Sequence, residues 1–335
     1  MSAPDRSLAA AVIGLGSMGV NHVRVYNEIE GVELVAVADV ALERLEMVRR
    51  GGGPRVYEDY GRLLAEERLD VVSVCVPTRL HLEVALAVIA KGVALLVEKP
   101  IAATLDEGRE MARAAREAGV PLMVGHVERF NPAVLEVKRR LQAGELGRVF
   151  QVFARRTGPF PKRVRDVGVV HDLAPHDIDI MRFLLESEVE RVYAETEQRI
   201  STEHEDMLSG LLRFRNGAVG VLDVNWLTPI KVRQLSVLGE RGLLLVDYLG
   251  EEVCFYRKAP PETAGADAAP GSAPQPLRFE RGEPLRLELE SFVTAVRRGE
   301  EPPVSAEEGL AALEVASLLV ESARGGRVMS IGETP

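Results

Sequence analysis

Cysteine is scarce in this chain. Only Cys75 and Cys254 occur among 335 residues, and they are far apart in the sequence. This excludes the paired cysteine spacing of a structural zinc site. Cys75 lies inside the apolar run 71–76, which predicts a buried, unreactive thiol.

Long hydrophobic runs and positive net charge are also lacking. No apolar stretch reaches the roughly 20 residues that span a membrane. The net charge of −10 argues against nucleic acid and anionic membranes as partners, because both bind through a basic surface field. The first residues carry no basic region ahead of the first apolar stretch, so no signal peptide is predicted and we expect a cytoplasmic protein.

The length and the 46% hydrophobic content predict two domains, because a single core stops growing at about 250–300 residues. Residues 1–124 alternate β-branched runs with amphipathic segments, which predicts an α/β domain with a doubly wound parallel sheet. From about residue 149 to residue 256 the sequence alternates apolar and polar residues, and residues 125–335 are therefore predicted to form an α+β domain with a largely antiparallel, open-faced sheet. We expect its C-terminal helices to pack back on the first domain.

Helix boundaries follow from local signals. Capping boxes at Thr104–Glu107 and Ser305–Glu308 predict helices over 105–118 and 305–323. A further helix is predicted over 284–298, and Pro132 marks a helix start. The Pro-, Ala- and Gly-rich stretch 259–276 predicts a mobile loop between strands.

The most informative motif is a glycine-rich turn directly after the apolar run 8–13. The segment reads Gly14-Leu15-Gly16-Ser17-Met18-Gly19. The first glycine permits a tight turn, the second lets a pyrophosphate approach the backbone, and the third allows close helix packing. The helix N-terminus that follows favours an anion.

A second apolar run ends in Asp39, about 20 positions past Gly19, where a carboxylate can bind the adenosine ribose hydroxyls. This completes a βαβ unit; the alternative is a chance glycine match with a simple turn at Asp39. Val40 follows Asp39 in place of a basic residue. A 2′-phosphate would be repelled by the carboxylate, so NAD is favoured over NADP.

Three motifs in order resemble the Gfo/Idh/MocA family of oxidoreductases: the glycine turn, Glu98-Lys99-Pro100 after a later strand, and Asp172-Leu-Ala-Pro-His176-Asp-Ile-Asp179. The resemblance spans nearly the whole chain. It implies an NAD(P)-dependent oxidoreductase of sugars or cyclitols, with the nicotinamide between the Rossmann domain and an open-faced sheet. It also implies catalytic roles for Lys99, Asp172 and His176.

The chemistry of alcohol oxidation agrees with these roles. A base must take the hydroxyl proton while hydride leaves the carbon, and a cation stabilises the developing alkoxide. His176 can accept the proton, Lys99 can supply the cation, and Asp172, four residues before His176, can orient the imidazole. At other strand ends, Pro77, Thr78 and Glu98 are expected near the cofactor. His81 resembles a family residue near the cofactor, or is a surface histidine.

The cluster of His171, Asp172, His176, Asp177 and Asp179 also has the residue types of a metal site. The family pattern accounts for these residues without a metal, so no metal is expected. Asp179 is interpreted as a structural hydrogen-bond acceptor.

Basic residues point to the substrate. The segment 155–165 contains five basic residues and no acidic residue. Such a segment suits a phosphate-bearing ligand; the alternative is a solvated edge or a subunit contact. His126 and Arg129 follow the last strand of the first domain. Within the family, segments 125–132, 155–159 and 225–228 look most like the UDP-N-acetylglucosamine 3-dehydrogenase group. The candidate substrate-binding residues are His126, Arg129, Arg155, Arg156, Arg165, Lys231 and Trp226, the last of which could instead fill the core.

Two alternatives differ in class. An inositol or simple-sugar dehydrogenase would not need the arginine cluster, and a non-catalytic NAD-binding regulator would not need Lys99, Asp172 and His176 together. The expected small-molecule partner is a sugar or nucleotide sugar. The uncovered face of the second sheet predicts a homodimer or homotetramer.

Overall fold

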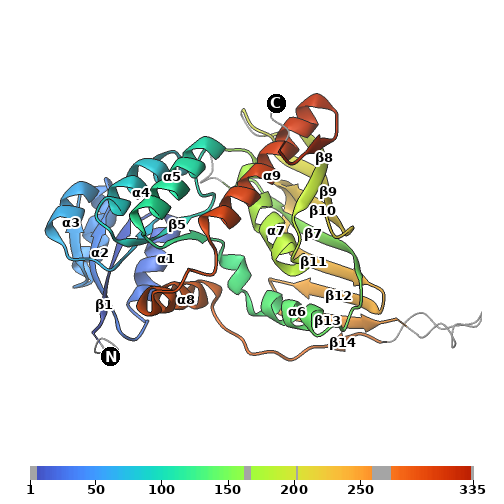
Figure 1. Ribbon diagram of the computed structural model, residues 1–335, viewed down its shortest axis with the longest axis horizontal. Coiled ribbons are helices and arrows are strands. Elements are labelled where there is room, and N and C mark those ends of the chain that lie inside the picture. Colours follow the sequence, from blue (N-terminus) through green and yellow to red (C-terminus); the bar gives the residue numbers. More distant parts are fainter. Residues whose placement is uncertain (1–5, 162–166, 201–202, 259–272, 333–335) are drawn as a thin grey trace, which may run out of the picture. The chain divides into compact units, whose positions relative to one another are not determined.

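The computed structural model describes residues 6–161, 167–200, 203–258 and 273–332. The chain forms two compact units (Figure 1). The first comprises residues 1–127 and 283–313, and the second comprises residues 128–282 and 314–335. Each unit is built on its own sheet.

The first unit contains a six-stranded parallel sheet with the order β3-β2-β1-β4-β5-β6. Crossover helices connect successive strands, as the alternating pattern of the sequence predicts. Its strands are β1 (Leu8–Ile13), β2 (Val32–Ala38), β3 (Arg55–Tyr57), β4 (Val71–Val74), β5 (Ala94–Glu98) and β6 (Leu122–Gly125). Its helical elements are α1 (Ser17–Tyr26), α2 (Leu42–Arg50), α3 (Tyr60–Glu66), η1 (Thr78–Leu80), α4 (His81–Ile89), α5 (Leu105–Ala118) and α8 (Pro284–Arg298).

The sheet is buried on both faces, so its strands are almost wholly apolar. Val71, Val72, Val74, Leu95 and Leu96 have no exposed surface at all. The short strand β3 was not predicted, because three residues beyond a glycine-rich turn carry no period that distinguishes a strand.

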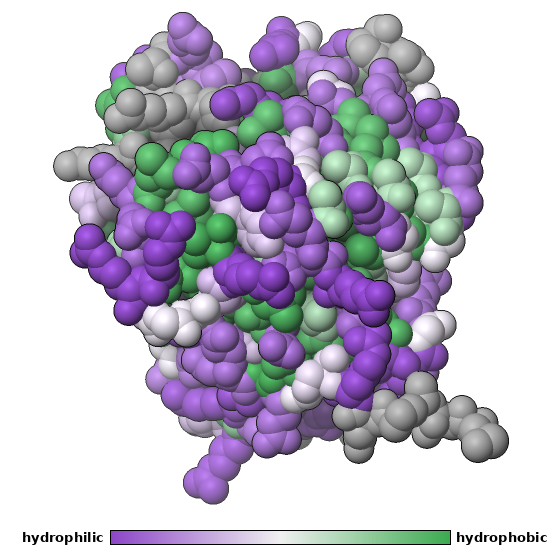
Figure 2. All heavy atoms as spheres, turned by 90° about the vertical axis from the view of Figure 1, so that its left-hand side faces the viewer, coloured by the Kyte–Doolittle hydropathy of each residue, from purple (hydrophilic) through white to green (hydrophobic). Residues whose placement is uncertain are grey.

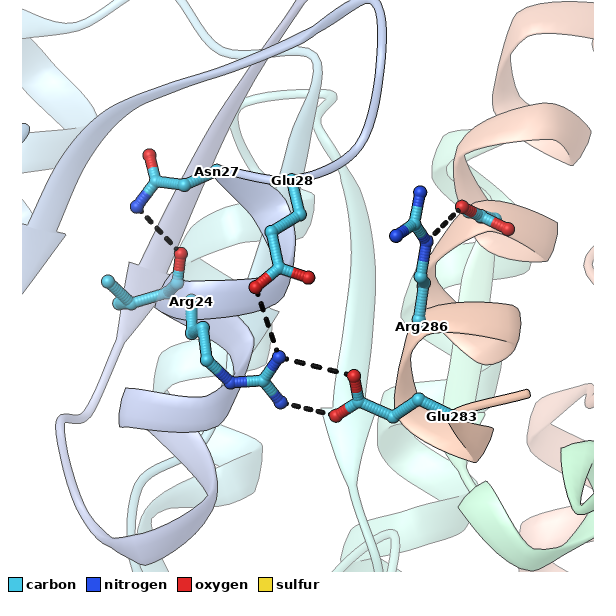
Figure 3. Close-up of polar contacts among 7 residues, drawn as sticks. Arg24, Asn27, Glu28, Glu283 and Arg286 are labelled. Atoms are coloured by element: carbon cyan, nitrogen blue, oxygen red, sulfur yellow. Dashed lines mark hydrogen bonds and ion pairs between the residues drawn. The ribbon is translucent and has the colours of Figure 1, made fainter. Parts of the chain in front are cut away.

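Helix α8 groups with the first unit although it is distant in sequence. It packs against α1, and Figure 3 shows Arg24 of α1 paired with Glu283 at the start of α8 and with Glu28. Arg286 binds Glu290 within α8, and Asn27 donates to the Val23 carbonyl oxygen. Helix α8 therefore packs against the helix that follows the glycine turn.

The second unit contains a nine-stranded sheet with the order β14-β13-β12-β11-β7-β10-β9-β8-β15. Every neighbouring pair is antiparallel except β7 and β10, which are parallel. Its strands are β7 (Val149–Pro159), β8 (Val189–Glu197), β9 (Met207–Phe214), β10 (Val219–Asn225), β11 (Leu227–Gly239), β12 (Gly242–Asp247), β13 (Glu252–Arg257), β14 (Gln275–Pro276) and β15 (Met329–Ser330). The largely antiparallel prediction is confirmed.

One face of this sheet is covered by α7 (Val169–Leu185), which packs on β7, β9 and β10. Helix α6 (Pro132–Gln142), preceded by the single turn η2 (Val127–Phe130), packs against β12 and β13. Helix α9 (Ala306–Gly325) contributes its first residues to the first unit and the rest to the second.

Several local predictions can be compared with these bounds. Helix α5 spans the predicted residues and carries the full capping box of Thr104 and Glu107. Helix α8 has the predicted limits, and Pro132 is the first residue of α6. At the start of α9 the Glu308 N–H donates to the Ser305 hydroxyl over 3.3 Å. Of the predicted loop, residues 259–272 lie outside the described residues, while Gln275 and Pro276 form β14, which corrects that end of the prediction.

The surface drawn in Figure 2 is mainly hydrophilic, with hydrophobic side chains in separate patches. No helix in the described ranges has the length and apolar character needed to cross a bilayer.

Candidate active site

The glycine turn has the geometry of a phosphate cradle. A side chain at Gly19 would lie 1.8 Å from the Gly14 carbonyl oxygen, and one at Gly14, where φ is +96°, would meet the Cys75 backbone. Gly16 by contrast faces open space. Helix α1 begins directly after Gly16 with no side-chain cap and no acidic residue in its first turn. Its N-terminal N–H groups therefore suit a pyrophosphate.

Asp39 lies at the end of β2, beside this turn. Its Oδ2 accepts the Leu15 N–H over 2.6 Å, and its Oδ1 accepts the Ala41 N–H over 2.7 Å. Arg44 of α2 donates to Oδ2 over 3.2 Å. The carboxylate thus joins β2 to the glycine turn, and its role in binding the ribose stays a prediction.

His81 is a buried residue at the start of α4 and not a surface histidine. Its Nε2 lies 3.0 Å from the Val76 carbonyl oxygen, and its Nδ1 lies 3.0 Å from that of Pro100. The ring therefore connects the loop after β4, which holds Pro77 and Thr78, to the loop after β5. Burial lowers the pKa of His81, and the carbonyl oxygens only partly oppose this.

Strand β5 ends at Glu98, and Lys99 follows it directly. Glu98 is buried and accepts the Lys99 N–H over 3.2 Å, while Lys99 is half-buried. Burial alone would raise the pKa of Glu98, but its hydrogen bond with His22, together with the charge and the backbone N–H of Lys99, outweighs burial and lowers it. His126, just past β6, is buried, and its backbone N–H donates to the Val124 carbonyl oxygen.

In the second unit α7 carries Asp172 and His176 one turn apart, on the same face of the helix. Asp172 is buried and His176 is half-buried. The start of α7 is closed by Glu205, whose backbone and side-chain oxygens accept the N–H groups of Val169 and Val170. Asp172 and His176 therefore lie on a helix whose first turn is held by Glu205.

The other acidic residues of α7 are engaged by arginines. Arg156 of β7 donates from Nε and Nη2 to both oxygens of Asp177 over 2.8 and 2.9 Å, and from Nη1 to Glu128 over 3.0 Å. Arg129 forms a similar two-bond pair with Asp179. The two arginines and the two aspartates of these pairs are all buried. The prediction that Asp179 is a structural acceptor agrees with this contact.

These contacts bear on two sequence predictions, that Arg156 binds a diphosphate and that Arg129 reaches the substrate. Both guanidinium groups already bind carboxylates inside the unit, which favours a structural role. Arg155 directly precedes Arg156 on β7, so its side chain points to the opposite face of the sheet. There Arg155 pairs with Asp223 over 2.7 Å. Arg165 lies outside the described residues.

Trp226 is buried, and its ring meets that of Phe160 edge-on at 5.4 Å. This favours its alternative role as a core residue. Lys231 is exposed, in the irregular stretch of β11 beside Gly158. Among the described residues no group of three or more acidic, histidine or cysteine side chains is arranged to hold a metal ion.

Sequence reasoning missed Arg233. It lies on β11 directly opposite Arg156, so the two side chains share the α7 face of the sheet. Its Nη1 donates to the carbonyl oxygens of Thr157 and Val232. Burial and the neighbouring Arg156 charge lower its pKa to about 10, partly offset by Asp177, Glu128 and Asp172. Only the strand register reveals this position.

A glycine turn of the dinucleotide-binding type, and a largely antiparallel sheet whose covering helix carries Asp172 and His176, are the features of a class of NAD-dependent oxidoreductases. Two family models match the chain. Residues 8–126 match the NAD-binding Rossmann fold of the Gfo/Idh/MocA oxidoreductase family, and residues 134–245 match the Gfo/Idh/MocA C-terminal domain. The chain belongs to the Gfo/Idh/MocA family.

Individual relatives agree with this. D-apiose dehydrogenase of Paraburkholderia graminis is 31% identical, over 96% of this chain and 89% of its own length. UDP-N-acetylglucosamine 3-dehydrogenase of Acidithiobacillus ferrooxidans is 28% identical, over 86% of this chain and 88% of its own. Inositol 2-dehydrogenases are similar at 28–30% identity.

Among solved structures, the WlbA dehydrogenase of Bordetella pertussis in complex with NADH and UDP-GlcNAcA has a TM-score of 0.86 and 25% identity, and covers 99% of this chain and 100% of its own. The protein is therefore an NAD-dependent dehydrogenase of the sugar and polyol type. The alternative of a non-catalytic regulator is not supported by these relatives, which are named as dehydrogenases.

Proposed function

We propose that this protein oxidises a secondary hydroxyl of a nucleotide sugar, the 3-hydroxyl of UDP-N-acetylglucosamine, to the ketone. NAD, when bound, accepts the hydride from the carbinol carbon. His176 takes the hydroxyl proton, Asp172 orients the imidazole, and the Lys99 ammonium stabilises the developing alkoxide. The support comes from the pair on α7 and from the relatives that act on or bind UDP sugars.

The observation that carries the choice of an anionic substrate is Arg233. It is a half-buried cation on the α7 face of the sheet, with Lys231 two residues away in the same strand. A phosphate or other anion bound there would relieve the repulsion from Arg156 and gain charge-assisted hydrogen bonds. We propose that Arg233 joins Lys231, a candidate from the sequence, in binding the diphosphate in place of Arg155 and Arg156.

The experiment is turnover of purified protein with NAD and UDP-N-acetylglucosamine, with an aminotransferase and an amine donor added to remove the ketone. We expect NADH formation and a 3-keto product. Variants Lys99→Met and His176→Asn should lower kcat by about 100-fold or more, with NAD affinity retained. Normal turnover by either variant would contradict its catalytic role.

The second candidate is an inositol dehydrogenase, favoured by the relatives of that activity. A neutral polyol has no anionic group for Arg233 to bind. Arg233→Gln should therefore raise KM for the UDP sugar about tenfold or more while leaving kcat nearly unchanged. The matched control is Arg155→Gln on the opposite face. Rapid turnover of inositol and none of UDP-N-acetylglucosamine would select this candidate.

We further propose that the protein forms a homodimer or homotetramer through the open face of the second sheet. A transverse row of cross-strand neighbours on that face consists mainly of apolar or aromatic side chains: Tyr193, Leu211, Val221, Phe153, Ser236, Leu245 and Cys254. Leu211 is 49% exposed and Leu245 is 36% exposed. Because the row is broad and weakly polar, a second copy of the same face can cover it.

Light scattering after size-exclusion chromatography tests this proposal. Leu211→Glu places a charge in the row and should convert the oligomer to a smaller species. Val40→Glu, at a 90% exposed apolar position in the first unit, is the control and should leave the mass unchanged. A monomeric wild-type protein would contradict the proposal.

A further inference from the structure

A chain of buried polar side chains runs through the first unit beneath the glycine turn. His22 and Tyr26 lie one turn apart on α1, Ser73 lies in the otherwise apolar strand β4, and Glu98 ends β5. His22 and Ser73 have no exposed surface, and Glu98 is 7% exposed. Polar groups this deeply buried are costly unless every one is hydrogen-bonded.

The distances form a continuous path. The Tyr26 hydroxyl lies 2.9 Å from the Ser73 Oγ, and the Ser73 Oγ lies 3.0 Å from His22 Nδ1. His22 Nε2 lies 3.0 Å from Glu98 Oε1, and Glu98 Oε2 accepts the Lys99 N–H over 3.2 Å. Helix α1 is thereby joined to the backbone of Lys99 through side chains alone.

One arrangement of hydrogens uses every group in this path. Tyr26 donates to Ser73, Ser73 donates to Nδ1 of His22, and Nε2–H of His22 donates to an ionised Glu98 carboxylate. A carboxylate has no hydrogen to give, so the ring hydrogen must lie on the nitrogen that faces it. The low pKa of Glu98 agrees with an ionised acceptor.

The space around Glu98 is shaped for this contact. Glu98 pairs in register with Gly125 of β6, and a Cβ at Gly125 would lie 3.3 Å from Glu98 Oε2. That is closer than a carbon normally approaches a carboxylate oxygen. The glycine leaves room for the carboxylate on one side, while His22 holds it on the other.

We infer that His22 is a positioning residue for Lys99: with its hydrogen on Nε2 it holds the Glu98 carboxylate, which holds the backbone of Lys99. The inference rests on the proposed function, in which Lys99 takes part in the reaction. His22 lies on the helix whose N-terminus receives the phosphates, so it ties the cofactor cradle to the reacting end of the site. Without it the Glu98 carboxylate is free to rotate, and Lys99 loses its fixed position.

Two variants separate the two ring nitrogens. Glutamine places its amide nitrogen as far along the side chain as Nε2, so His22→Gln keeps the Glu98 contact. Asparagine can place its amide oxygen at the position of Nδ1, where it accepts the Ser73 hydroxyl hydrogen, so His22→Asn keeps the Ser73 contact and loses Glu98. We expect His22→Gln to retain kcat within about threefold and His22→Asn to lose about 100-fold, with thermal stability lowered comparably in both. Equal kcat values in the two variants would overturn the inference.

Two spectroscopic readouts do not need turnover. Nitrogen-15 NMR of the imidazole should show the Nε2–H tautomer for His22, and the opposite tautomer would overturn the inference. The sequence has only six lysines, so reductive methylation gives few signals, and Lys99→Arg assigns that of Lys99. The Lys99 methyl signal should shift in His22→Asn and stay in place in His22→Gln.

The control is Tyr57→Phe, which removes a tyrosine–glutamate hydrogen bond elsewhere in the same unit. It should leave kcat and the Lys99 signal unchanged. If wild-type protein turns over no sugar at all, the proposed function fails, while the tautomer and the Lys99 signal still decide whether His22 positions Lys99. An unshifted Lys99 signal in His22→Asn would overturn the inference whatever the substrate.

Discussion

At the scale of single residues, the Asp39 carboxylate has one observed role and one predicted role. Its oxygens accept the backbone N–H groups of Leu15 and Ala41, and we expect the same carboxylate to bind the adenosine ribose hydroxyls. Arg44 adds a cation next to the same oxygen. We therefore expect both the geometry of the turn and the choice between NAD and NADP to depend on this side chain.

Asp39→Ala should weaken NAD binding by about tenfold, a loss of roughly 1.4 kcal/mol. It should also improve NADP binding, because the repelling carboxylate is gone and Arg44 can meet a 2′-phosphate. Isothermal titration with each dinucleotide measures both effects. Asp59→Ala, which removes the cap of α3 in the same unit, is the control and should leave both affinities unchanged. Unaltered NAD affinity in Asp39→Ala would contradict the assignment.

At the scale of elements, Arg156 joins β7 to α7. The residue is only 4% exposed, and its guanidinium group binds Asp177 through two hydrogen bonds. Burial alone would lower the pKa of Arg156, but the charges of Asp177 and Glu128 outweigh it and raise it. Breaking a buried pair of this kind leaves an uncompensated carboxylate.

Arg156→Met should therefore lower the free energy of unfolding by about 3 kcal/mol or more. Arg155→Met removes the neighbouring arginine from the exposed pair with Asp223 and should cost about 1 kcal/mol or less. Urea denaturation of both variants measures the difference. Similar stabilities would show that the Arg156 pair does not hold α7 to the sheet.

At the scale of the whole molecule, buried titratable groups set the dependence of stability on pH. Burial lowers the pKa of His81 and of His171 below the ordinary value of 6.5. Such histidines stay neutral in the folded state while the unfolded chain takes up protons. Their contribution to stability is complete above pH 6.5 and is lost as the pH falls towards their folded-state pKa values.

Carboxylates act at lower pH in the same direction. The pKa values of Asp70, Glu98 and Glu136 lie below their ordinary values. Burial alone would raise each of them, but hydrogen bonds outweigh it: Asp70 accepts from Arg6, Glu98 is bonded to His22, and Glu136 accepts from Arg139 and Arg140. Their contribution is present above pH 4.5 and is lost on further acidification.

We therefore expect the free energy of unfolding to fall in two stages, first below about pH 6.5 and then below about pH 4.5. Urea denaturation across this range measures it. His171→Gln should flatten the first stage and leave the second. A stability that rises on acidification from pH 7 to pH 5 would contradict the shifts of both histidines.

The sequence by itself determined the features that depend on neighbouring residues. The glycine turn, the Asp39 spacing, the capping box of α5 and the alternation of the second sheet are all local, so the two kinds of sheet and the NAD cradle could be predicted. The positions of Lys99, Asp172 and His176 followed from motifs, and their catalytic roles remain predictions.

The tertiary structure decided which charges are available. Arg156 and Arg155 are adjacent in sequence, yet strand alternation sends them to opposite faces, and Asp177 neutralises one of them. Arg233 became a candidate because register places it opposite Arg156, and His22 because α1 brings it to Glu98, 76 residues away. Pairings at such separations depend on packing and strand order, which a local pattern does not encode.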